Sequence, residues 1–442
     1  MRRRAGRLVA LALTLALAAS ACTGDGDDAS PAPDPQDPVA PAPVALGGAL
    51  ADVDGPVSLG VLVSTGAPSA EGGDLAASAE GAVVARERVR AGGGELELVV
   101  RDDRGDAATA LDAVGELADA GVAGIVLATT GPHVVDAVAA AAAEGLPVVL
   151  PYGAPGDLPT GAWSTAPSPA AVGATLTAGL ADLRFTRPYV VSVDGALVDG
   201  VEGAQSLSTT SDALAAAVGR IEAAARAETV DSVVVAGPPR AQAQVAAAVQ
   251  ALSDGGGAAQ GTVDALPVAL TPQALAPSFA TELAQAGGVL GGQFLSAGPD
   301  ATDATTLSGG TAGDSAAAYF AALRTAAADT DVANLLGDGP FGATADAADL
   351  ASHDAVVALV RAVEEAGTTE PAAVADALGG LALDSSSGLA GAPLDFTDAQ
   401  ALPDASVVLL TATTDDPGVR PAATATPAAG GRLYWFAAPG GE

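Results

Sequence analysis

The sequence predicts an α/β protein with two lobes, each built on a mostly parallel β-sheet that helices cover on both faces. One observation is the alternation of short apolar runs with helical segments of about 10 to 15 residues. Strands that alternate with helices in this way pair in parallel through right-handed crossovers. The other observation is the length of 442 residues, which suits two domains of ordinary size. Because 49% of the residues are hydrophobic but only 3% aromatic, both cores should be aliphatic.

The first series of elements begins at Val57. Residues 57–63 form an apolar run that a glycine-rich turn follows, so we expect a strand there. Small and apolar residues at helical spacing predict a helix from Leu75 to Val89. The alternation continues with strand 95–100, helix 109–120, strand 124–128, helix 134–144 and strand 147–150.

A second series begins after Pro167 and predicts the second lobe. The acidic, glycine-rich interval 301–314 is predicted to be a loop, and strands 406–411 and 432–437 should close a sheet in antiparallel fashion. The other expected elements are helix 170–183, strand 189–193, helix 211–226, strand 232–236 and helices 241–252, 316–327 and 353–366.

The first 22 residues have the parts of an export signal. Four arginines precede an apolar run from Leu8 to Ala18, which is shorter than the roughly 20 residues needed to span a bilayer. The run ends in Ala19-Ser20-Ala21-Cys22, which resembles a bacterial lipobox. We therefore predict a lipoprotein signal peptide over residues 1–22 and a chain that acyl groups on Cys22 anchor to the outer face of the cell membrane. Ordinary secretion, with Cys22 in the discarded peptide, is the alternative.

Residues 23–55 are rich in proline, aspartate and alanine. Proline stiffens such a segment and like charges extend it, so we expect a disordered linker between the membrane and the folded body. Cys22 is the only cysteine of the chain, which excludes an internal disulfide.

The charge balance and the missing motifs exclude several classes of function. The 53 acidic residues against 18 arginines, with no lysine, give a formal net charge of −35, which repels nucleic acid. The two histidines, His133 and His353, form no HExxH pair, and CxxC, GxSxG and Walker A motifs are absent from the sequence. We therefore expect no enzyme activity and no catalytic residues, and neither a cofactor nor a bound metal.

Three aspartates follow the second predicted strand: Asp102, Asp103 and Asp106. Such a group could hold a metal ion or act as an acid/base pair. The alternative is that they are solvated loop residues that cap the helix beginning near Ala107, where carboxylates accept hydrogen bonds from free amides. We favour the capping role.

Loops at the carboxyl ends of parallel strands are where α/β sheets bind ligands. Three such loops contain glycine with small or hydroxyl-bearing residues, which lets main-chain amides approach a ligand. Thr130-Gly131 also precedes the helix expected from Val134, whose N-terminus favours a carboxylate. The alternative is that these residues only make tight turns. The candidate ligand-binding residues in these loops are Ser64, Thr65, Thr129, Thr130, Gly131, Tyr152, Gly153 and Ala154.

Several segments occur in a distinctive order. They begin with residues 57–66 (VSLGVLVSTG) and 92–106 (GGGELELVVRDDRGD) and continue through 143–149, 231–237, 290–294, 354–367 and 372–378. Together they resemble the leucine/isoleucine/valine-type periplasmic binding proteins. The likeness spans roughly residues 56–440, and the order of the segments carries it rather than any one motif.

This resemblance implies a type I solute-binding fold, in which two Rossmann-like lobes joined by three crossings close over a small solute. It assigns residues 56–166 with 299–368 to lobe 1, and residues 167–298 with 369–440 to lobe 2. In such proteins the first lobe holds the ligand carboxylate through loop hydroxyls and amides. The matching positions here are Thr130, Gly131, Gly153 and Ala154.

The second lobe departs from the family pattern. The resemblance implies a tyrosine near residues 198–200, an aromatic residue near 237–238 and an acid for a ligand ammonium near Thr271, and none of the three is present as such. An unpaired ammonium is costly to bury. Three alternatives therefore stay open: an acid such as Asp199 substitutes, the ligand lacks an ammonium, or ligand binding has been lost. Asp199 and Thr271 complete the candidate ligand-binding residues.

The function that the resemblance implies is that of an extracytoplasmic, lipid-anchored solute-binding protein of an ABC importer. Its ligands would be amino acids or related small carboxylate or amide solutes, captured by hinge closure. Its partners would be the solute, an ABC permease and, through the lipid anchor alone, the membrane, with no nucleic acid and with a monomeric chain. The alternative is a sensor or interaction lipoprotein that reuses the fold without transport.

Overall fold

The computed structural model describes residues 44–51, 53, 55–66, 72–196, 198–253, 265–421 and 431–438. The chain divides into two units, Met1–Pro41 and Ala42–Glu442, and all described residues belong to the second unit. The predicted signal peptide, the lipidation candidate Cys22 and most of the predicted linker therefore lie outside the described residues.

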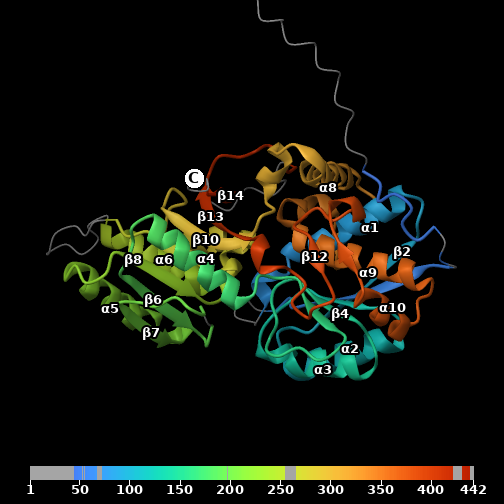
Figure 1. Cartoon of the computed structure of the whole chain (residues 1–442), viewed down its shortest axis with the longest axis horizontal. Helices are drawn as coiled ribbons and strands as arrows, with labels where there is room; N and C mark the ends of the chain where they lie inside the picture. The colour runs from blue at the N-terminus through green and yellow to red at the C-terminus, as the bar shows by residue number, and fades with distance from the viewer. Residues whose placement is uncertain are drawn as a thin grey trace, which may run out of the picture. The chain divides into compact units, whose positions relative to one another are not determined.

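The first lobe contains a five-stranded sheet (Figure 1). Its strands are β1 Val57–Val63, β2 Leu96–Asp102, β3 Ile125–Leu127, β4 Val148–Leu150 and β5 Ala162–Ser164. The strand order is β2-β1-β3-β4-β5, and every neighbouring pair is parallel, which confirms the predicted parallel sheet. The sequence pattern does not predict β5, because its residues Ala162–Ser164 form no apolar run.

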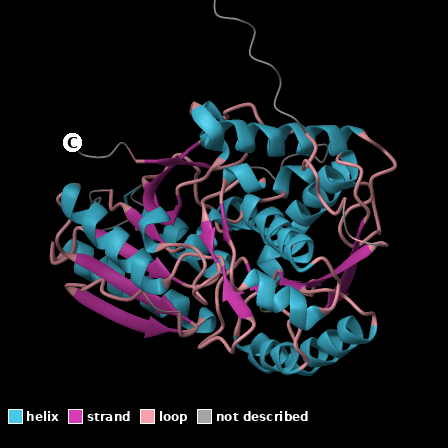
Figure 2. Ribbon diagram, turned by 45° about the vertical axis from the view of Figure 1, so that its right-hand side comes forward, coloured by secondary structure: helices cyan, strands magenta, loops and turns pink. Residues whose placement is uncertain are grey.

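Helices cover both faces of this sheet (Figure 2). They are α1 Gly81–Ala91, α2 Ala107–Asp119, α3 Val135–Ala143, α8 Gly310–Ala328, α9 Leu350–Ala366 and α10 Pro371–Leu378. Val61 of β1 packs into the core beneath α1, α8 and α9, whereas the next residue, Leu62, packs beneath α2 and α3. Each fully buried aliphatic side chain stabilises the lobe by about 1.5 to 3 kcal/mol relative to exposure.

Capping side chains fix the starts of two of these helices. Asp106 Oδ1 accepts a hydrogen bond from Thr109 N at 2.9 Å, which confirms its capping role at α2. Asp349 Oδ1 accepts one from Ser352 N at 2.8 Å at the start of α9. Helix α1 begins at Gly81 rather than at the predicted Leu75, because two short 3₁₀ turns, η1 Gly73–Leu75 and η2 Ser78–Glu80, precede it.

The second lobe contains a seven-stranded sheet. Its strands are β6 Pro188–Val193, β7 Gln205–Thr209, β8 Ser232–Ala236, β9 Val268–Leu270, β10 Phe294–Pro299, β13 Val407–Thr413 and β14 Tyr434–Ala437. The order is β14-β13-β10-β9-β8-β6-β7. Strands β6 to β10 pair in parallel, whereas β13 pairs antiparallel with β10 and with β14, which confirms the predicted antiparallel closing strands.

Alternation along the strands also gives this sheet two buried faces. The helices are α4 Pro169–Asp182, α5 Leu214–Arg226, α6 Pro239–Ser253 and α7 Pro277–Gln285. Leu176 of α4 packs in one core cluster with Val190, while Val191 packs in another with Ile221 of α5. Both neighbouring valines of β6 are thus removed from water, as parallel sheets require.

Residues 371–402 pack with the first lobe, although the sequence analysis assigns residues 369–440 to the second. Helix α10 lies against α9, and strands β11 Ala382–Leu383 and β12 Leu394–Asp395 form a small antiparallel pair. Trp163 Nε1 donates a hydrogen bond to Phe396 O at 2.8 Å, and Ser164 N donates one to Ala399 O at 2.8 Å. The chain joins the second sheet only at β13.

Two other segments differ from expectation. The interval 301–314, predicted as a loop, contains η6 Asp303–Leu307 and the first turn of α8, so that prediction is wrong for these residues. Leu46 and Ala49, placed in the predicted linker, are buried in the first-lobe core. Leu46 N also donates a hydrogen bond to Arg88 O at 2.9 Å, so the end of that segment packs against α1.

Candidate functional site

The topology brings the predicted loops of the first lobe together. Strands β1, β3 and β4 are consecutive neighbours and run parallel, so their carboxyl ends lie at one edge of the sheet. The three loops that follow these strands contain all eight candidate residues of the first lobe. The fold therefore positions these residues as the strand pattern predicts.

Four polar side chains form a buried cluster at this edge, which we call the Ser64 cluster: Ser64, Asp103, Thr129 and His133. Ser64 Oγ donates to Asp103 Oδ1 at 2.6 Å and lies 2.7 Å from Thr129 Oγ1. Since the Ser64 proton is committed to Asp103, the Thr129 hydroxyl donates to Ser64. His133 Nε2 lies 3.3 Å from Asp103 Oδ2 and 3.4 Å from Ser64 Oγ.

The predicted solvation of the three aspartates is wrong for Asp103. Its side chain is fully buried, because Ser64, His133 and the main-chain N–H of Gly105 enclose it. Asp102 is partly buried, and its Oδ1 accepts a hydrogen bond from Thr65 N at 2.7 Å. Thr65 Oγ1 donates to the other oxygen of the same carboxylate. Only Asp106 of the three acts as the predicted cap.

The Ser64 cluster contains the residue types of a hydrolytic triad but not its geometry. In a triad the base accepts from serine through one ring nitrogen and is oriented by the acid through the other. Here the same atom, His133 Nε2, faces both Ser64 and Asp103, and Asp103 is bonded directly to Ser64. This arrangement fits a structural hydrogen-bond network rather than a nucleophile with its base.

The segment Gly72–Leu75 covers the hydroxyls of this cluster. Ser64 and Thr129 are both 0% exposed. A Cβ atom added to Gly72 would lie 1.9 Å from Thr129 Oγ1 and 3.1 Å from Ser64 Oγ, and the φ angle of Gly72 is 73°. Only glycine fits this close approach in a left-handed conformation. Ser64 and Thr129 therefore face the protein interior in this conformation.

The remaining loop candidates lie nearer the surface. Thr130 Oγ1 is within 3.4 Å of Gly153 O, so the loops after β3 and β4 are adjacent. Gly131 and Gly153 have φ angles of 138° and 116°, which favour glycine at both positions. Ala154 is exposed. The main-chain groups of these loops are thus the first-lobe candidates that a solute could reach with least rearrangement.

Tyr152 points toward the start of α9. Its hydroxyl lies beside Asp349 and Ser352 but has no hydrogen-bond partner of ordinary geometry. Burial raises the pKa of Tyr152 well above its usual range, and the Asp349 charge adds to this effect. Burial also raises the pKa of Asp349 to about 6, although hydrogen bonds from the side chain and main chain of Ser352 oppose it. Tyr152 therefore packs within the first lobe.

The second-lobe candidates are Asp199 and Thr271. Asp199 is exposed, and its main chain packs closely on Gly173 of α4. Thr271 follows β9 and is 4% exposed, and its hydroxyl has no hydrogen-bond partner among the described residues. No sequence pattern points to Gln242 as a residue of this site. Its Nε2 donates a hydrogen bond to Gly237 O at 2.7 Å, and its Oε1 accepts one from Thr271 N at 2.9 Å. Gln242 thus ties the loops after β8 and β9 together.

One acidic side chain of the first lobe reaches the second. Burial raises the pKa of Asp74, while a hydrogen bond from the main-chain N–H of Arg240, near the start of α6, opposes this shift. Glu282 of α7 raises the pKa further by repulsion and pairs with Arg240, Nε to Oε2, at 3.1 Å. The segment that covers Ser64 and Thr129 is therefore held against the second lobe as well.

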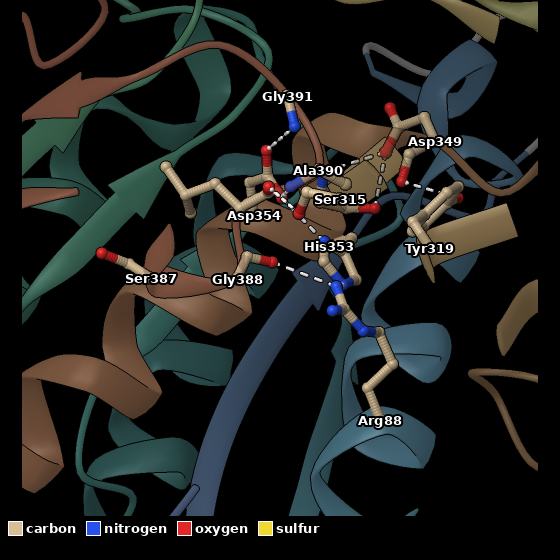
Figure 3. Close-up of polar contacts among 12 residues, drawn as sticks. Arg88, Ser315, Tyr319, Asp349, His353, Asp354, Ser387, Gly388, Ala390 and Gly391 are labelled. Carbon is tan, nitrogen blue, oxygen red and sulfur yellow. Dashed lines mark hydrogen bonds and ion pairs between the residues drawn. The ribbon is translucent and has the colours of Figure 1, made fainter. Parts of the chain in front are cut away.

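A second buried polar network lies inside the first lobe (Figure 3). Arg88 Nη1 lies 3.0 Å from His353 Nε2 and donates to Gly388 O at 3.0 Å. His353 Nδ1 is 2.7 Å from Asp354 Oδ1, and the same carboxylate accepts from the main-chain N–H groups of Ala390 and Gly391. This network joins α1 and α9 to the loop before β12.

No candidate residue lines either of two hollows of the described surface. One, of about 340 Å³, lies between α3 and residues 155–159, and the other, of about 520 Å³, lies between Tyr189 of β6 and Arg220 of α5. In the part of the chain that the structure describes, no group of three or more histidine, cysteine or carboxylate side chains could hold a metal ion. No helix among these residues is both long and apolar enough to cross a membrane.

Solved structures with the same arrangement are periplasmic and extracellular ligand-binding proteins. A type 1 periplasmic binding protein from Bordetella pertussis Tohama I has a TM-score of 0.59 at 16% identity over 82% of this chain and 98% of that one. The branched-chain amino acid transporter substrate-binding protein LivJ from Streptococcus pneumoniae, in complex with isoleucine, has a TM-score of 0.56 at 16% identity over 82% and 97%. A solute-binding protein from Rhodopseudomonas palustris, in complex with 4-hydroxybenzoate, has a TM-score of 0.54 at 15% identity over 87% and 96%.

These likenesses establish the two-lobed type I periplasmic binding fold. A family model described as periplasmic binding protein matches residues 56–416, which is most of the chain, and the chain therefore belongs to the periplasmic binding protein family. Members of this family are solute-binding proteins that work outside the cytoplasm with ABC permeases. A search of curated proteins finds no match.

Proposed function

We propose that this protein is the lipid-anchored solute receptor of an ABC importer and that it captures a small carboxylate-bearing solute between its lobes. Amino acids and aromatic acids are the solute classes to test first, because structural relatives hold isoleucine and 4-hydroxybenzoate. The observation that carries the proposal is the convergence of the loops after β1, β3 and β4 at one sheet edge. In this proposal the main-chain donors of Thr130, Gly131, Gly153 and Ala154 hold the carboxylate.

The buried Ser64 and Thr129 hydroxyls have a supporting part in this proposal. They hold the loops after β1 and β3 in register through the 2.7 Å contact between them. In the second lobe, the unpartnered Thr271 hydroxyl is available to a ligand, and Gln242 holds its main chain in place. Asp199 would supply a carboxylate from the exposed loop after β6.

A thermal-shift screen tests solute capture. Isoleucine, leucine, 4-hydroxybenzoate and short amides should be added separately, and a true ligand raises the melting temperature increasingly as its concentration exceeds its dissociation constant. For the solute that responds, Thr130→Trp should abolish the shift by filling the loop beside Gly153, whereas Thr325→Trp on the exposed face of α8 should leave it unchanged. An unchanged affinity in the Thr130 variant would remove this loop from the site.

The anchor is tested separately at Cys22. We infer that acylation at Cys22 retains the chain at the membrane and that the following residues act as a spacer. Wild-type protein should incorporate a labelled fatty acid and sediment with membranes, and Cys22→Ser should do neither. Wild type that takes up no label and is released as a soluble protein would instead favour ordinary secretion.

A sensor or interaction lipoprotein is the second candidate function. The observation that favours it is the complete burial of the Ser64 and Thr129 hydroxyls beneath Gly72, together with the contact between Asp74 and the second lobe. A protein that has replaced its solute with its own segment would show no thermal shift with any compound. It should also show no association with a permease in crosslinking experiments on whole cells.

A further inference from the structure

Residues 414–421 and 431–433 are the described parts of the connection between β13 and β14, and they contact the first lobe. Both strands belong to the second sheet and pair with each other. In Figure 1 the segment that follows β13 extends toward α8 of the first lobe. There, Arg324 Nη1 of α8 donates a hydrogen bond to Val419 O at 2.5 Å. Val419 thus contacts a helix that packs on the other sheet.

Arg420, the next residue, makes the strongest contacts of this connection. Its guanidinium binds both oxygens of Asp303, with Nε 2.5 Å from Oδ2 and Nη2 2.8 Å from Oδ1. Its Nη1 donates to Asp346 O at 3.1 Å and to Ala348 O at 2.6 Å. The Arg420 side chain is 8% exposed, and its guanidinium carbon lies 5.3 Å from the ring centre of Phe320.

The far end of the same connection reaches the same first-lobe turn. Arg432 Nη1, just before β14, also donates to Asp346 O. Its guanidinium carbon lies 5.7 Å from the ring centre of Tyr434, the first residue of β14. Arg420 and Arg432 therefore both bind the turn around residues 346–348, and Ala348 is fully buried in the core of the first lobe.

These contacts resist separation of the lobes. A bidentate pair between arginine and carboxylate holds one geometry, and breaking it would leave the Asp303 carboxylate, 13% exposed, without its partner. The two main-chain carbonyls would also lose a buried charged donor. A rotation that opens the lobes must therefore break this contact, bend the strands β13 and β14, or pivot around Arg420.

We propose that residues 414–421, together with Arg432, form a strap that ties the second sheet to the first lobe and that Arg420 limits how far the lobes separate. The strap adds a non-covalent restraint, with its own specific partner, to the chain crossings between the lobes. This role concerns lobe motion alone, so it holds whether or not the protein transports a solute.

The test measures the distance between the lobes. The full chain with Cys22→Ser carries spin labels at Leu111→Cys on α2 and Val289→Cys in the second lobe, both at exposed positions. Double electron–electron resonance then gives the distribution of distances. Arg420→Gln and Asp303→Asn should each broaden the distribution and add longer distances, and the double variant should add little beyond either single variant.

Arg361→Gln is the matched control. Arg361 also pairs with a carboxylate, Glu364, at 2.7 Å and donates to a main-chain carbonyl, but it lies wholly within the first lobe. Its removal should lower the melting temperature and leave the distance distribution unchanged. A folded Arg420→Gln or Asp303→Asn protein with the wild-type distribution would overturn the strap. If Arg420→Gln does not fold, the distances are measured in Arg420→Lys, which keeps the charge without the bidentate contact. A wild-type distance distribution in this variant would likewise overturn the strap.

Discussion

Ser64 and Thr129 share a hydrogen bond of 2.7 Å although 65 residues separate them in the chain. Ser64 directly follows β1 and Thr129 lies two residues after β3, and the two strands are neighbours in the first sheet. The contact therefore joins the loops after β1 and β3, beneath Gly72. It lies at the sheet edge where we propose that the solute binds.

The Ser64–Thr129 contact should appear as an energetic coupling. Ser64→Ala leaves the buried Asp103 carboxylate short of a donor, so we expect a loss of about 1 to 3 kcal/mol in the free energy of unfolding. Thr129→Val should cost about 1 kcal/mol. Chemical denaturation of the two single variants and the double variant measures the coupling, which should reach at least about 0.5 kcal/mol. Strict additivity would show that the two hydroxyls act independently.

Gly72 should tolerate no side chain. In Gly72→Ala the new Cβ would overlap Thr129 Oγ1, and alanine is strained at the positive φ angle of this residue. We expect a loss of about 1 to 3 kcal/mol, measured by urea denaturation. Gly156→Ala is the control, because nothing lies within 4 Å of a Cβ added there. Equal denaturation midpoints for the two variants would mean that the segment moves away from Thr129 at little cost.

His353 should make the fold less stable in acid. Burial lowers the pKa of His353 below its ordinary value, although Asp354 opposes this effect, so the unfolded chain binds the proton more readily. The contribution of neutral His353 to the free energy of unfolding is therefore fully present above the unfolded pKa of about 6.5, and it is lost as the pH falls below that value. His353→Gln should flatten the pH dependence of the free energy of unfolding between about pH 7 and 5. An unchanged slope would show that His353 does not titrate differently on unfolding.

Glu80 should make the fold less stable as the pH rises. Burial raises the pKa of Glu80 to about 7, despite the hydrogen bond that its Oε2 accepts from Leu335 N at 3.0 Å. The folded chain therefore holds this proton more tightly than the unfolded chain, and stability falls as the pH rises from about 4.5 to 7. Glu80→Gln should be more stable than wild type at pH 8 by on the order of 1 to 3 kcal/mol, and nearly equal to it at pH 4.5.

The control for Glu80 is Glu116→Gln, because the Glu116 side chain is 62% exposed. This variant should follow the wild-type curve at both pH values. A Glu80→Gln protein that loses stability at pH 8 would indicate that the carboxylate is ionised and well paired in the fold.

The sequence predicts the strands that form clear apolar runs and misses several others. The apolar run at 57–63 and the valines of 232–236 match β1 and β8 residue for residue. Strands β3 and β4 have only three residues each but are predicted, whereas the equally short β5 and β9 and the longer β7 and β10 are missed, so strand length alone does not decide the outcome. The predicted start of α1 is too early because the helical spacing of small and apolar residues continues through the two 3₁₀ turns that precede Gly81.

Some features of the candidate site follow from local sequence patterns, and others depend on contacts between residues that lie far apart in the chain. A strand followed by a glycine-bearing loop is a local signal, and it places Thr130 and Gly153 next to each other. The burial of Asp103 comes from Ser64 and His133, each 30 or more residues away in the chain, so no local pattern could reveal it. Gln242 likewise takes its role from loops after two different strands.

The first lobe depends on contacts between the two ends of the chain. Val44 O accepts a hydrogen bond from Arg88, which also binds Gly388 O, and the exposed side of β5 is closed by residues 399 and 400. During synthesis this lobe therefore lacks these contacts until the residues near 400 have emerged, so its core is completed late.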